Sequence, residues 1–401
     1  MPPKVLTVSE IFWPEGGGAE LATRLIVEQL SRTGYEVTVV TGTRKPEPVP
    51  GVEFRYTPLL KASNRLVRWG LMEALAQQRW FKELLKSHDV LYVPLAAYPL
   101  IPLAKKHGLR VVVHLHNYAP VRYHSVKYYF EPDAPTLSQE LKLALYHELY
   151  AHRNPARTAL IPLSFALYKR SRAWIRQADT IICVSKRQAE IVTKSAPELA
   201  DKIRVAYNPI PPELVSLKLE KALDEVPTIL YVSGDSHVKG FYIIPRVMHI
   251  LDKKKVKMKF ITAGSYRQKN IRMLKNLARK LSFLEVQILG KVDHNKVVEL
   301  HKTAWALLFP SIIEEPLPYA VVESMALGTV PVASRAGGVL EMLEGTRATE
   351  LIFQPGNIEN IMNRLEILTS MNDSEVIALG NELREKIKSF SNILVSNIIT
   401  K

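Results

Sequence analysis

The sequence has few of the features that mark secreted, disulfide-stabilised or membrane-spanning proteins. Cys183 is the only cysteine among 401 residues, which excludes an intramolecular disulfide framework and is typical of a reducing compartment. The longest apolar run, residues 90–104, contains three prolines and is shorter than the roughly 18 residues of a membrane span. Residues 1–4 lead directly into an apolar run, so we expect no signal peptide. These absences predict a cytoplasmic protein, including one bound to the cytoplasmic face of a membrane.

Recognised nucleic-acid-binding motifs and the G-x-G-x-x-G dinucleotide fingerprint are also missing. Acidic residues are the scarcer charged type, and the net charge is +15. The excess is uneven: residues 1–208 hold 29 Lys and Arg against 18 Asp and Glu, whereas the remainder holds 25 against 21. A basic half favours a phosphorylated substrate or an anionic membrane surface as partner, and argues little for nucleic acid. Simple solubility remains an alternative explanation of the charge.

Short Val-, Ile- and Leu-rich runs alternate with amphipathic helical patterns along the whole chain. Strands are expected at 5–9, 36–41, 90–93, 111–114 and 180–184, and again at 228–232, 259–263, 286–289, 306–309 and 330–333. This alternation predicts an α/β protein with two doubly wound, Rossmann-like domains. We place them at 1–208 and 227–380, with a proline-rich linker at 209–226 and a C-terminal helix at 381–401 that could return to the first domain. Ligands of such sheets bind at the carboxyl ends of the strands.

Two turns after predicted strands carry groups suited to phosphate. Gly16, Gly17 and Gly18 separate the first strand from the first helix, where glycines allow close backbone approach and a helix N-terminus attracts an anion. Lys239 lies in the turn after the first strand of the second domain, where an ammonium could neutralise a diphosphate. A flexible turn and a solvated lysine are the simpler alternatives.

His114 and His116 end a strand and, two residues apart, share one of its faces. His116 is nearer the carboxyl end, where this architecture places chemistry. Two histidines without a third ligand make a weak case for zinc, and two ordinary polar residues at a strand end remain an alternative. No metal site is therefore predicted.

The most informative stretch is residues 310–328, P-S-I-I-E-E-P-L-P-Y-A-V-V-E-S-M-A-L-G. Glu315 precedes a short helix and Glu323 lies inside it, among apolar residues where an unpaired buried charge would be costly. Carboxylates accept hydrogen bonds from sugar hydroxyls, and the helix N-terminus suits phosphate. The combination predicts a nucleotide sugar as ligand. Glu314 competes with Glu315 for the first position, and the sequence does not decide between them.

Taken in order, these motifs resemble the retaining GT-B glycosyltransferases of the large family four. The resemblance covers most of the chain, from the glycine loop through His116–Asn117, A-D-T-I-I-C-V-S and Lys239–Gly240 to the Glu315/Glu323 block and Gly337–Gly338. It implies a sugar transfer from an NDP-sugar to an acceptor hydroxyl with retention of configuration. No cofactor is implied beyond the NDP-sugar itself, and no metal, since the chain has no Asp-x-Asp pair.

The resemblance also implies a role for each matching position. Glu323 would hold the ribose, Glu315 the donor sugar, and His116 would lie beside the transferred sugar. Lys239 would contact the diphosphate, and Gly17 and Gly18 would meet it from the first domain. The main-chain N–H groups of Leu317 and Tyr319 would face the sugar and phosphate. Gly290 and Lys291 would lie near the base, and Gly234 is a further donor-binding position.

The chain departs from the family pattern in two places that matter. After the first glutamate, Pro316 and Leu317 replace the usual glycine and phenylalanine. Where the family commonly has Gly-Arg, this sequence has Ser233–Gly234–Asp235, so Lys239 would act alone or with a group such as Arg335. The missing arginine motivates an alternative, a catalytically silent GT-B protein that binds nucleotide sugars or serves as a scaffold. An epimerase or a phosphorylase of the same fold is a further rival, although we identify no pyridoxal lysine.

The acceptor is expected to be a glycan or a lipid-linked molecule. Residues 61–86 read as a basic amphipathic helix with Trp69, Trp80 and Phe81, and residues 169–176 form a second basic stretch with Trp174. Basic residues with Trp and Leu suit an anionic membrane surface. Ordinary helix packing with a solvated basic face is the alternative. The irregular segment 118–174 is interpreted as helices and loops inserted beside the site.

Overall fold

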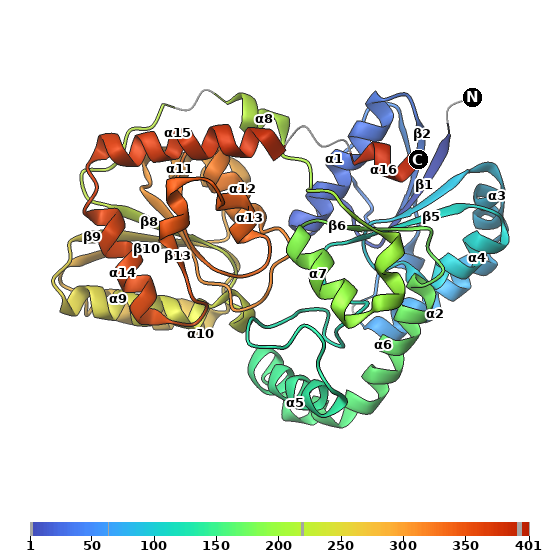
Figure 1. The fold of residues 1–401 in the computed structure, drawn as a ribbon, viewed down its shortest axis with the longest axis horizontal. Helices are drawn as coiled ribbons and strands as arrows, with labels where there is room; N and C mark the ends of the chain where they lie inside the picture. The colour runs from blue at the N-terminus through green and yellow to red at the C-terminus, as the bar shows by residue number, and fades with distance from the viewer. Residues whose placement is uncertain (1–2, 63, 218–219, 391–394, 401) are drawn as a thin grey trace. The chain divides into compact units, whose positions relative to one another are not determined.

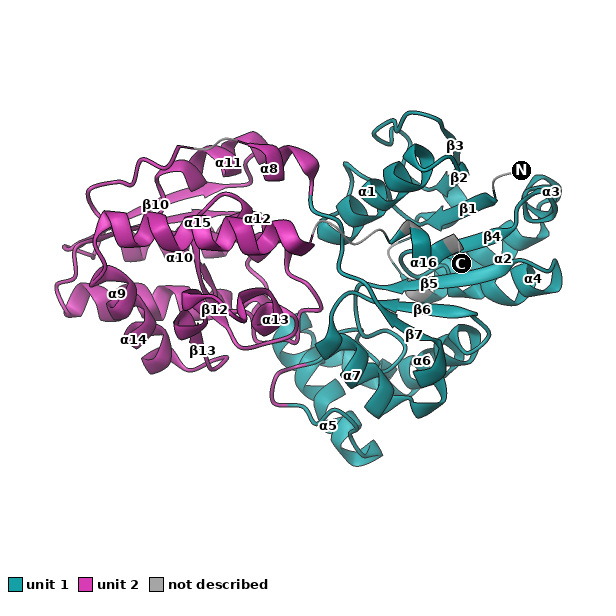
Figure 2. Ribbon diagram, turned by 45° about the horizontal axis from the view of Figure 1, so that its top comes forward, with its two compact units in different colours: residues 1–127, 131–210, 393–401 teal, residues 128–130, 211–392 magenta. Residues whose placement is uncertain are grey.

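The computed structural model describes residues 3–62, 64–217, 220–390 and 395–400. Two compact units divide the chain: unit 1 takes the ranges 1–127, 131–210 and 393–401, and unit 2 takes 128–130 and 211–392 (Figure 2). Each unit is a parallel sheet with helices on both faces (Figure 1). The predicted α/β architecture of two doubly wound domains, the GT-B fold, is confirmed.

Unit 1 contains a seven-stranded sheet in the order β3-β2-β1-β4-β5-β6-β7, with every pairing parallel. Its strands are β1 Lys4–Ser9, β2 Glu36–Thr41, β3 Val52–Tyr56, β4 Val90–Val93, β5 Arg110–Leu115, β6 Thr180–Cys183 and β7 Ile203–Val205. Its helices are α1 Gly18–Arg32, α2 Arg65–Gln77, α3 Arg79–Ser87, α4 Ile101–Lys106, α5 Leu137–His147, α6 Ile161–Ile175, α7 Lys186–Ser195 and α16 Ser396–Thr400.

The alternation of side chains along β1 explains the two-layered core of unit 1. Leu6 and Val8 pack into a cluster with α2, α3, α4, α6 and α7, whereas Val5 packs on the other face with α1 and α16. Successive strand residues point to opposite faces, so a strand buried on both faces reads as a continuous apolar run. The beginning of α6 and α5 form a separate small cluster around Phe165 and Tyr168.

Unit 2 contains a six-stranded parallel sheet in the order β10-β9-β8-β11-β12-β13. Its strands are β8 Thr228–Val232, β9 Met258–Ala263, β10 Leu284–Gly290, β11 Ala306–Phe309, β12 Val330–Ser334 and β13 Ile352–Phe353. Its helices are α8 Pro212–Ser216, α9 Ile244–Lys253, α10 Gln268–Ala278, α11 His294–Thr303, α12 Tyr319–Ala326, α13 Val339–Leu343, α14 Ile358–Thr369 and α15 Asp373–Phe390. Helices α9, α10 and α14 cover one face, and α11, α12 and α15 cover the other (Figure 1).

The predicted linker and C-terminal helix differ from the structure. Within 209–226, α8 and Lys221 pack with unit 2, and the Lys221 ammonium donates to the backbone oxygens of His301 and Ala304 and to the Thr329 hydroxyl. Burial lowers the pKa of Lys221 to about 7. The predicted helix 381–401 is two elements, because α15 continues from Asp373 to Phe390 in unit 2 and α16 belongs to unit 1. Positions 218–219, 391–394 and 401 of these two predictions lie outside the described residues.

The two basic aromatic stretches that we expected at a membrane surface supply core instead. The first is two helices, α2 and α3, which part at Gln78, where the backbone is extended. Phe81 is fully buried, and Trp69 packs edge-on against Trp174, with their ring centroids 5.0 Å apart. These aromatic side chains are therefore unavailable to a bilayer, and the simpler alternative, helix packing, is correct for them.

Candidate active site

The strand order of unit 2 reverses between β8 and β11, which lie side by side. The segments that follow these two strands leave the sheet in opposite directions, and such a point opens a crevice at the carboxyl edge. Here the segments are 233–239 after β8 and 310–315 after β11. The backbone N–H of Ile312 donates to the Val238 carbonyl at 3.0 Å, which joins the two segments. The predicted Lys239 and Glu315 thus lie at the switch point of one sheet.

Two glycine turns hold the segment between Pro310 and Glu315. Gly240 has φ of +70°, and a Cβ there would lie 1.9 Å from the Pro310 carbonyl oxygen. Gly337 has φ of +61°, and a Cβ there would lie 1.7 Å from the Glu315 carbonyl oxygen. Neither position tolerates a side chain without moving this backbone. The amide of Gly338 also donates to the Glu315 carbonyl, at 3.0 Å, so the backbone of Glu315 is fixed.

Lys239 and Glu315 form a two-point ion pair. The ammonium lies 2.6 and 2.8 Å from the two carboxylate oxygens of Glu315. The hydroxyl of Ser311 lies 2.9 Å from one of the same oxygens. The Glu315 side chain is largely buried, whereas that of Lys239 is about one-third exposed. The pair therefore presents a cation and a carboxylate together at the switch point, which suits a ligand with both phosphate and hydroxyl groups.

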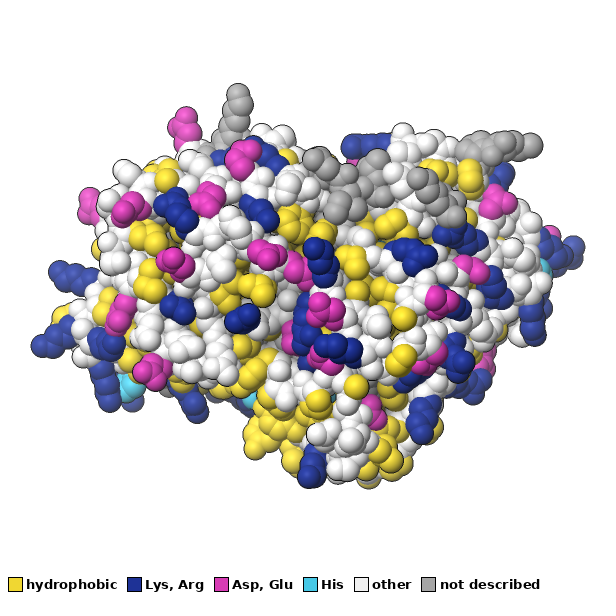
Figure 3. Space-filling model, in the orientation of Figure 1, with side chains coloured by type: hydrophobic (Ala, Val, Ile, Leu, Met, Phe, Trp, Pro, Cys, Tyr) yellow, Lys and Arg dark blue, Asp and Glu magenta, His cyan; other side chains and the backbone are white. Residues whose placement is uncertain are grey.

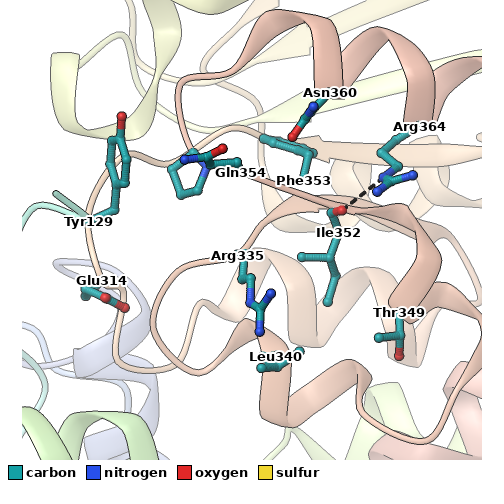
Figure 4. A pocket seen from close by; sticks show the side chains of 11 residues that line it. Tyr129, Glu314, Arg335, Leu340, Thr349, Ile352, Phe353, Gln354, Asn360 and Arg364 are labelled. Carbon is teal, nitrogen blue, oxygen red and sulfur yellow. Dashed lines mark hydrogen bonds between the residues drawn. The ribbon is translucent and has the colours of Figure 1, made fainter.

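Glu314 points to a different environment from Glu315. Its carboxylate accepts a hydrogen bond from the Gly337 amide. It lines a pocket of about 600 Å³ in unit 2 with Arg335, Arg364 and Tyr129 (Figure 4). The structure therefore separates the two candidates, with Glu315 on Lys239 and Glu314 on the pocket that contains Arg335. Which carboxylate meets the donor sugar, and whether Arg335 meets phosphate, remain predictions.

Helix α12 begins at Tyr319 after Pro318, and no side chain caps its first turn. Glu323, one turn further along, accepts from the Nε2 of His294 at 3.1 Å if that nitrogen carries the proton. His294 opens α11, three residues after Lys291, which directly follows β10. The hydrogen bond to Glu323 raises the pKa of His294, and this outweighs its partial burial. The segment bearing Gly290 and Lys291 therefore approaches the predicted ribose carboxylate, and His294 is a residue that the sequence analysis missed.

The turn where the resemblance leads one to expect an arginine is organised around Asp235. Its carboxylate accepts from the backbone N–H of Arg267 at 2.7 Å, from the Arg267 Nε at 3.1 Å and from Asn270. Burial would raise the pKa of Asp235, but these hydrogen bonds outweigh it and lower the pKa. Gly234 precedes it in the same turn. An arginine is thus present, supplied by the start of α10, and its guanidinium is bound to Asp235.

The sheet of unit 1 has its own switch point, between β1 and β4. The glycine loop follows β1, as predicted, and leads into α1 at Gly18. The backbone N–H of Gly17 donates to the Glu20 carboxylate at 2.7 Å. The protein's own carboxylate therefore occupies the helix N-terminus where the resemblance implies a diphosphate. Contacts of Gly17 and Gly18 with a donor remain predictions.

Glu10, directly after β1, was not anticipated as a site residue. Its side chain is buried, one oxygen accepts from the Ala96 amide at 3.2 Å, and the other has no hydrogen-bond partner among the described residues. Burial raises the pKa of Glu10. Its position immediately after the first strand was the signal that could have identified it, because strand ends at a switch point supply ligand contacts.

His116 lies just beyond the end of β5, beside His114, with ring centroids 4.4 Å apart. His114 faces Tyr92 in the core, where its Nδ1 lies 2.8 Å from the tyrosine hydroxyl. The Nδ1 of His116 lies 3.5 Å from the Asn208 amide, and its Nε2 has no partner among the described residues. Burial lowers the pKa of His116 to about 4. His116 is therefore a neutral imidazole whose Nε2 is left for a ligand; the Nε2 of His114 also has no partner among the described residues, but its Nδ1 is bound to Tyr92 within the core.

Two doubly wound parallel sheets with polar groups at their switch points define the class of GT-B proteins. Residues 16–214 match the model of the family Glycosyltransferase Family 4, and residues 218–390 match that of Glycosyl transferases group 1. With these two matches along its length, the chain belongs to the GT-B glycosyltransferases of the family-four type.

Relatives and solved structures agree with this assignment. An uncharacterized glycosyltransferase of Methanocaldococcus jannaschii is 30% identical over 177 residues, 41% of this chain and 44% of that protein. The sulfoquinovosyl transferase of Arabidopsis thaliana is 22% identical over 43% of this chain and 32% of its own length. The match thus spans less than half the length of each of these two curated relatives.

Solved structures resemble the whole chain in fold. Sucrose-phosphate synthase from Thermosynechococcus elongatus superposes with a TM-score of 0.72 at 16% identity, covering 97% of this chain and 95% of that one. The Anabaena protein HepE, solved in complex with UDP-glucose, has a TM-score of 0.64 at 16% identity and covers 99% and 97%. Among the helices of the part of the chain described, none has the length and apolar character needed to cross a membrane.

Proposed function

We propose that the protein transfers a hexosyl group from an NDP-sugar to an acceptor hydroxyl with retention of configuration. The observation that carries this proposal is the Lys239–Glu315 pair, held at the switch point of unit 2 by the two glycine turns. It offers a cation for a diphosphate and a carboxylate for sugar hydroxyls within one hydrogen-bonded group. The UDP-glucose bound to the HepE protein of similar fold supports the donor class.

Each group has a defined part in this reaction. The bond between the anomeric carbon and the diphosphate oxygen breaks, and the acceptor oxygen attacks from the same face. The acceptor proton passes to the departing diphosphate, so no strong side-chain base is needed. Lys239 and the uncapped N-terminus of α12 stabilise the negative charge on the leaving group. Glu315 holds the donor sugar, and Glu323 holds the ribose. For Glu323 to bind the ribose, its carboxylate must share or release the hydrogen bond with His294.

The neutral imidazole of His116 suits a hydrogen bond with the transferred sugar. Because Lys239 and a helix N-terminus carry the charge stabilisation, the proposed mechanism uses no metal and no cofactor. Water exclusion around the donor would limit hydrolysis.

The test is release of NDP from a panel of UDP-, GDP- and ADP-sugars by the purified protein, with Glu323→Ala compared to the original sequence. We expect the substitution to lower the rate with the preferred donor by about 10²-fold or more, as for loss of a buried hydrogen-bonding group in a site. Glu385→Ala is the matched control, because that side chain is 72% exposed on α15, where it pairs with the neighbouring Lys388. Equal NDP release by the Glu323 and Glu385 variants would refute the assignment.

A second candidate is a GT-B protein that binds nucleotide sugars without turning them over. The observation that favours it is Asp235, which stands where the family has an arginine and whose charge engages Arg267. Equilibrium binding of the same donor panel separates the two candidates. Donor binding without NDP release, in the presence of cell-derived glycan and lipid acceptors, would support the silent protein.

The acceptor that we propose is lipid-linked or held at a membrane surface. The excess of Lys and Arg over Asp and Glu in residues 1–208 supports binding of this half of the chain to an anionic membrane surface. Of the aromatic residues that first suggested this acceptor, Trp69, Phe81 and Trp174 are in the core and Trp80 packs against it, so the support must come from another surface of unit 1.

A further inference from the structure

An apolar stripe runs along the exposed side of α5 and into the helical turn that follows it. Four leucines spaced four residues apart, Leu137, Leu141, Leu145 and Leu149, are 62%, 45%, 44% and 39% exposed. Residues four apart share one face of a helix, so these side chains form a continuous row. Single exposed leucines are common on proteins, but a contiguous row marks an interaction site.

The next segment of the chain widens this row into a surface. Tyr150, Leu160 and Leu163 are 53%, 53% and 46% exposed, and the space-filling view shows hydrophobic side chains gathered around α5 (Figure 3). We call this surface the leucine face, and its members are Leu137, Leu141, Leu145, Leu149, Tyr150, Leu160 and Leu163. Beneath it, a small core around Phe165 and Tyr168 supports α5 and α6, so the leucines are displayed on ordered helices.

The charge of the same segment complements an anionic partner. Residues 134–170 contain five Lys and Arg and two Glu. One of the two, Glu148, is buried and already paired with Arg157 and His152, each at 2.8 Å. Arg157 pairs with Glu148 and Arg170 with Glu73, which leaves Lys142, Arg153 and Lys169 against Glu140 in this segment. Leucine and tyrosine bordered by Lys and Arg are the composition of helices that lie in the interface of an anionic bilayer.

A pocket of about 460 Å³ opens within this surface. Leu160 and Leu163 belong to the leucine face and also line the pocket, together with Ser164. Its polar side contains Glu148, which accepts from the Tyr123 hydroxyl at 2.6 Å and from the Arg157 Nε at 2.8 Å, and which lies 2.8 Å from the His152 Nδ1. Burial would raise the pKa of Glu148, but these hydrogen bonds outweigh it and lower the pKa, so the carboxylate is ionised.

Exposed leucines of the leucine face and the buried carboxylate of Glu148 therefore line the same pocket. A molecule with an apolar tail in the leucine face and a polar head in the pocket would match both parts. A flat protein partner would cover the leucines but leave the pocket unused. The geometry therefore favours a lipid surface over a second protein.

We propose that unit 1 docks on an anionic bilayer through the leucine face, which brings a lipid head to the mouth of the pocket. This inference deepens the proposed function, since it assigns the surface at which a lipid-linked acceptor would be met. It replaces the helices of residues 61–86 as the membrane-binding element, because Trp69 and Phe81 are buried there and Trp80 is partly buried against the same core.

The test is flotation of the full chain with vesicles of phosphatidylcholine alone or of an equimolar mixture with phosphatidylglycerol, at low salt. We expect flotation with the mixture, and a fall of about tenfold or more in bound protein for Leu141→Glu/Leu145→Glu, since each leucine transfers apolar area to the bilayer. Met273→Glu is the matched control, because Met273 is 40% exposed on α10 of unit 2. Unchanged thermal melting verifies that the variants are folded.

A second measurement identifies the surface directly. Cys183 is buried and its pKa is raised to about 12 by burial, so a new surface cysteine is the reactive one. An environment-sensitive fluorophore on Leu145→Cys should shift to shorter wavelength when the mixed vesicles are added. The same fluorophore on Met273→Cys should not respond.

Each outcome decides the proposal. Absence of flotation with the mixed vesicles, or equal flotation of the double glutamate variant, overturns it. Concentration-dependent dimerisation that the double variant abolishes, without vesicle binding, would show that a second copy covers the leucine face and would also overturn it. NDP release from the donor panel is measured on the same samples. Normal turnover without flotation would overturn the docking proposal but not the proposed transferase activity. Flotation without turnover would overturn the proposed transferase activity but not the docking proposal.

Discussion

Substituting alanine at Gly337 should damage the candidate site more than it damages the fold. Gly337 has φ of +61°, and an added Cβ would lie 1.7 Å from the Glu315 carbonyl oxygen and 2.6 Å from its amide nitrogen. Real Cβ atoms essentially never approach closer than 3.0 Å, so the backbone of Glu315 has to move by about 1 Å or more. The Lys239–Glu315 pair moves with it.

Gly345 provides the control that separates the backbone strain of a left-handed alanine from the displacement of Glu315. Its φ is +79°, and a Cβ there meets nothing within 4 Å. Alanine in the left-handed region costs about 1 to 2 kcal/mol at either glycine. The two variants therefore share the backbone penalty, and the Gly337 variant alone shifts the carboxylate. A misplacement of about 1 Å in an active site costs about 10²-fold in rate, or about 3 kcal/mol in the activation barrier.

The assay is kcat/KM for NDP release with the preferred donor, together with the thermal midpoint of each variant. We expect both variants to melt at lower temperature, with the larger decrease for Gly337→Ala. We expect kcat/KM to fall by about 10²-fold for Gly337→Ala and to stay within about twofold for Gly345→Ala. Equal kcat/KM for the two variants would refute the argument that Gly337 positions Glu315 for the donor.

Three further predictions concern single side chains. Lys239→Met should lower the NDP release rate by about 10²- to 10³-fold, because the charge stabilising the departing diphosphate is lost; a rate like that of the original protein would exclude the role. Glu20→Gln should lower the donor KM by about two- to fivefold, because a carboxylate leaves the N-terminus of α1; a higher KM would mean that Glu20 organises the loop instead. The lowered pKa of His116, about 4 against an ordinary 6.5, means that the unfolded chain binds a proton in this interval and the folded chain does not. Stability should therefore fall as the pH drops from 6.5 toward 4, and His116→Gln should remove about 1 to 2 kcal/mol of that fall at pH 5, as measured by urea unfolding.

The fold was readable from the sequence where strands are buried on both faces. The runs that became β1, β4, β5, β8 and β11 are near-continuous apolar residues, and their positions are as expected. The edge strands β3 and β7 were missed because they carry polar or exposed residues, for which alternation is weak, and the edge strand β13 was missed because its two apolar residues are too few to show a period. The helix boundary at Gln78 was missed because the residues around it carry no Gly or Pro.

The site was predictable where a motif fixes both residue type and strand end. Lys239 and Glu315 meet as a pair because both follow strands that flank the switch point. Partners that come from other segments, such as His294 on Glu323 and Arg267 on Asp235, depend on the packing of α10 and α11 and leave no local pattern. For the aromatic stretches, the sequence does not show which way the side chains point. Trp69 would have the same helical spacing whether it faced a bilayer or Trp174.

The three residues Tyr128–Phe130 belong to unit 2 although their sequence neighbours belong to unit 1. Tyr128 forms an antiparallel bridge with Ile313, and the Tyr129 amide donates to the Ile312 carbonyl at 3.1 Å, directly before the two glutamates. A fragment cut at residue 211 would therefore be an incomplete catalytic half. It would lose a strand partner beside Glu314 and Glu315 and expose their backbone to water, so donor-binding studies on such a truncated fragment should underestimate the affinity of the intact chain.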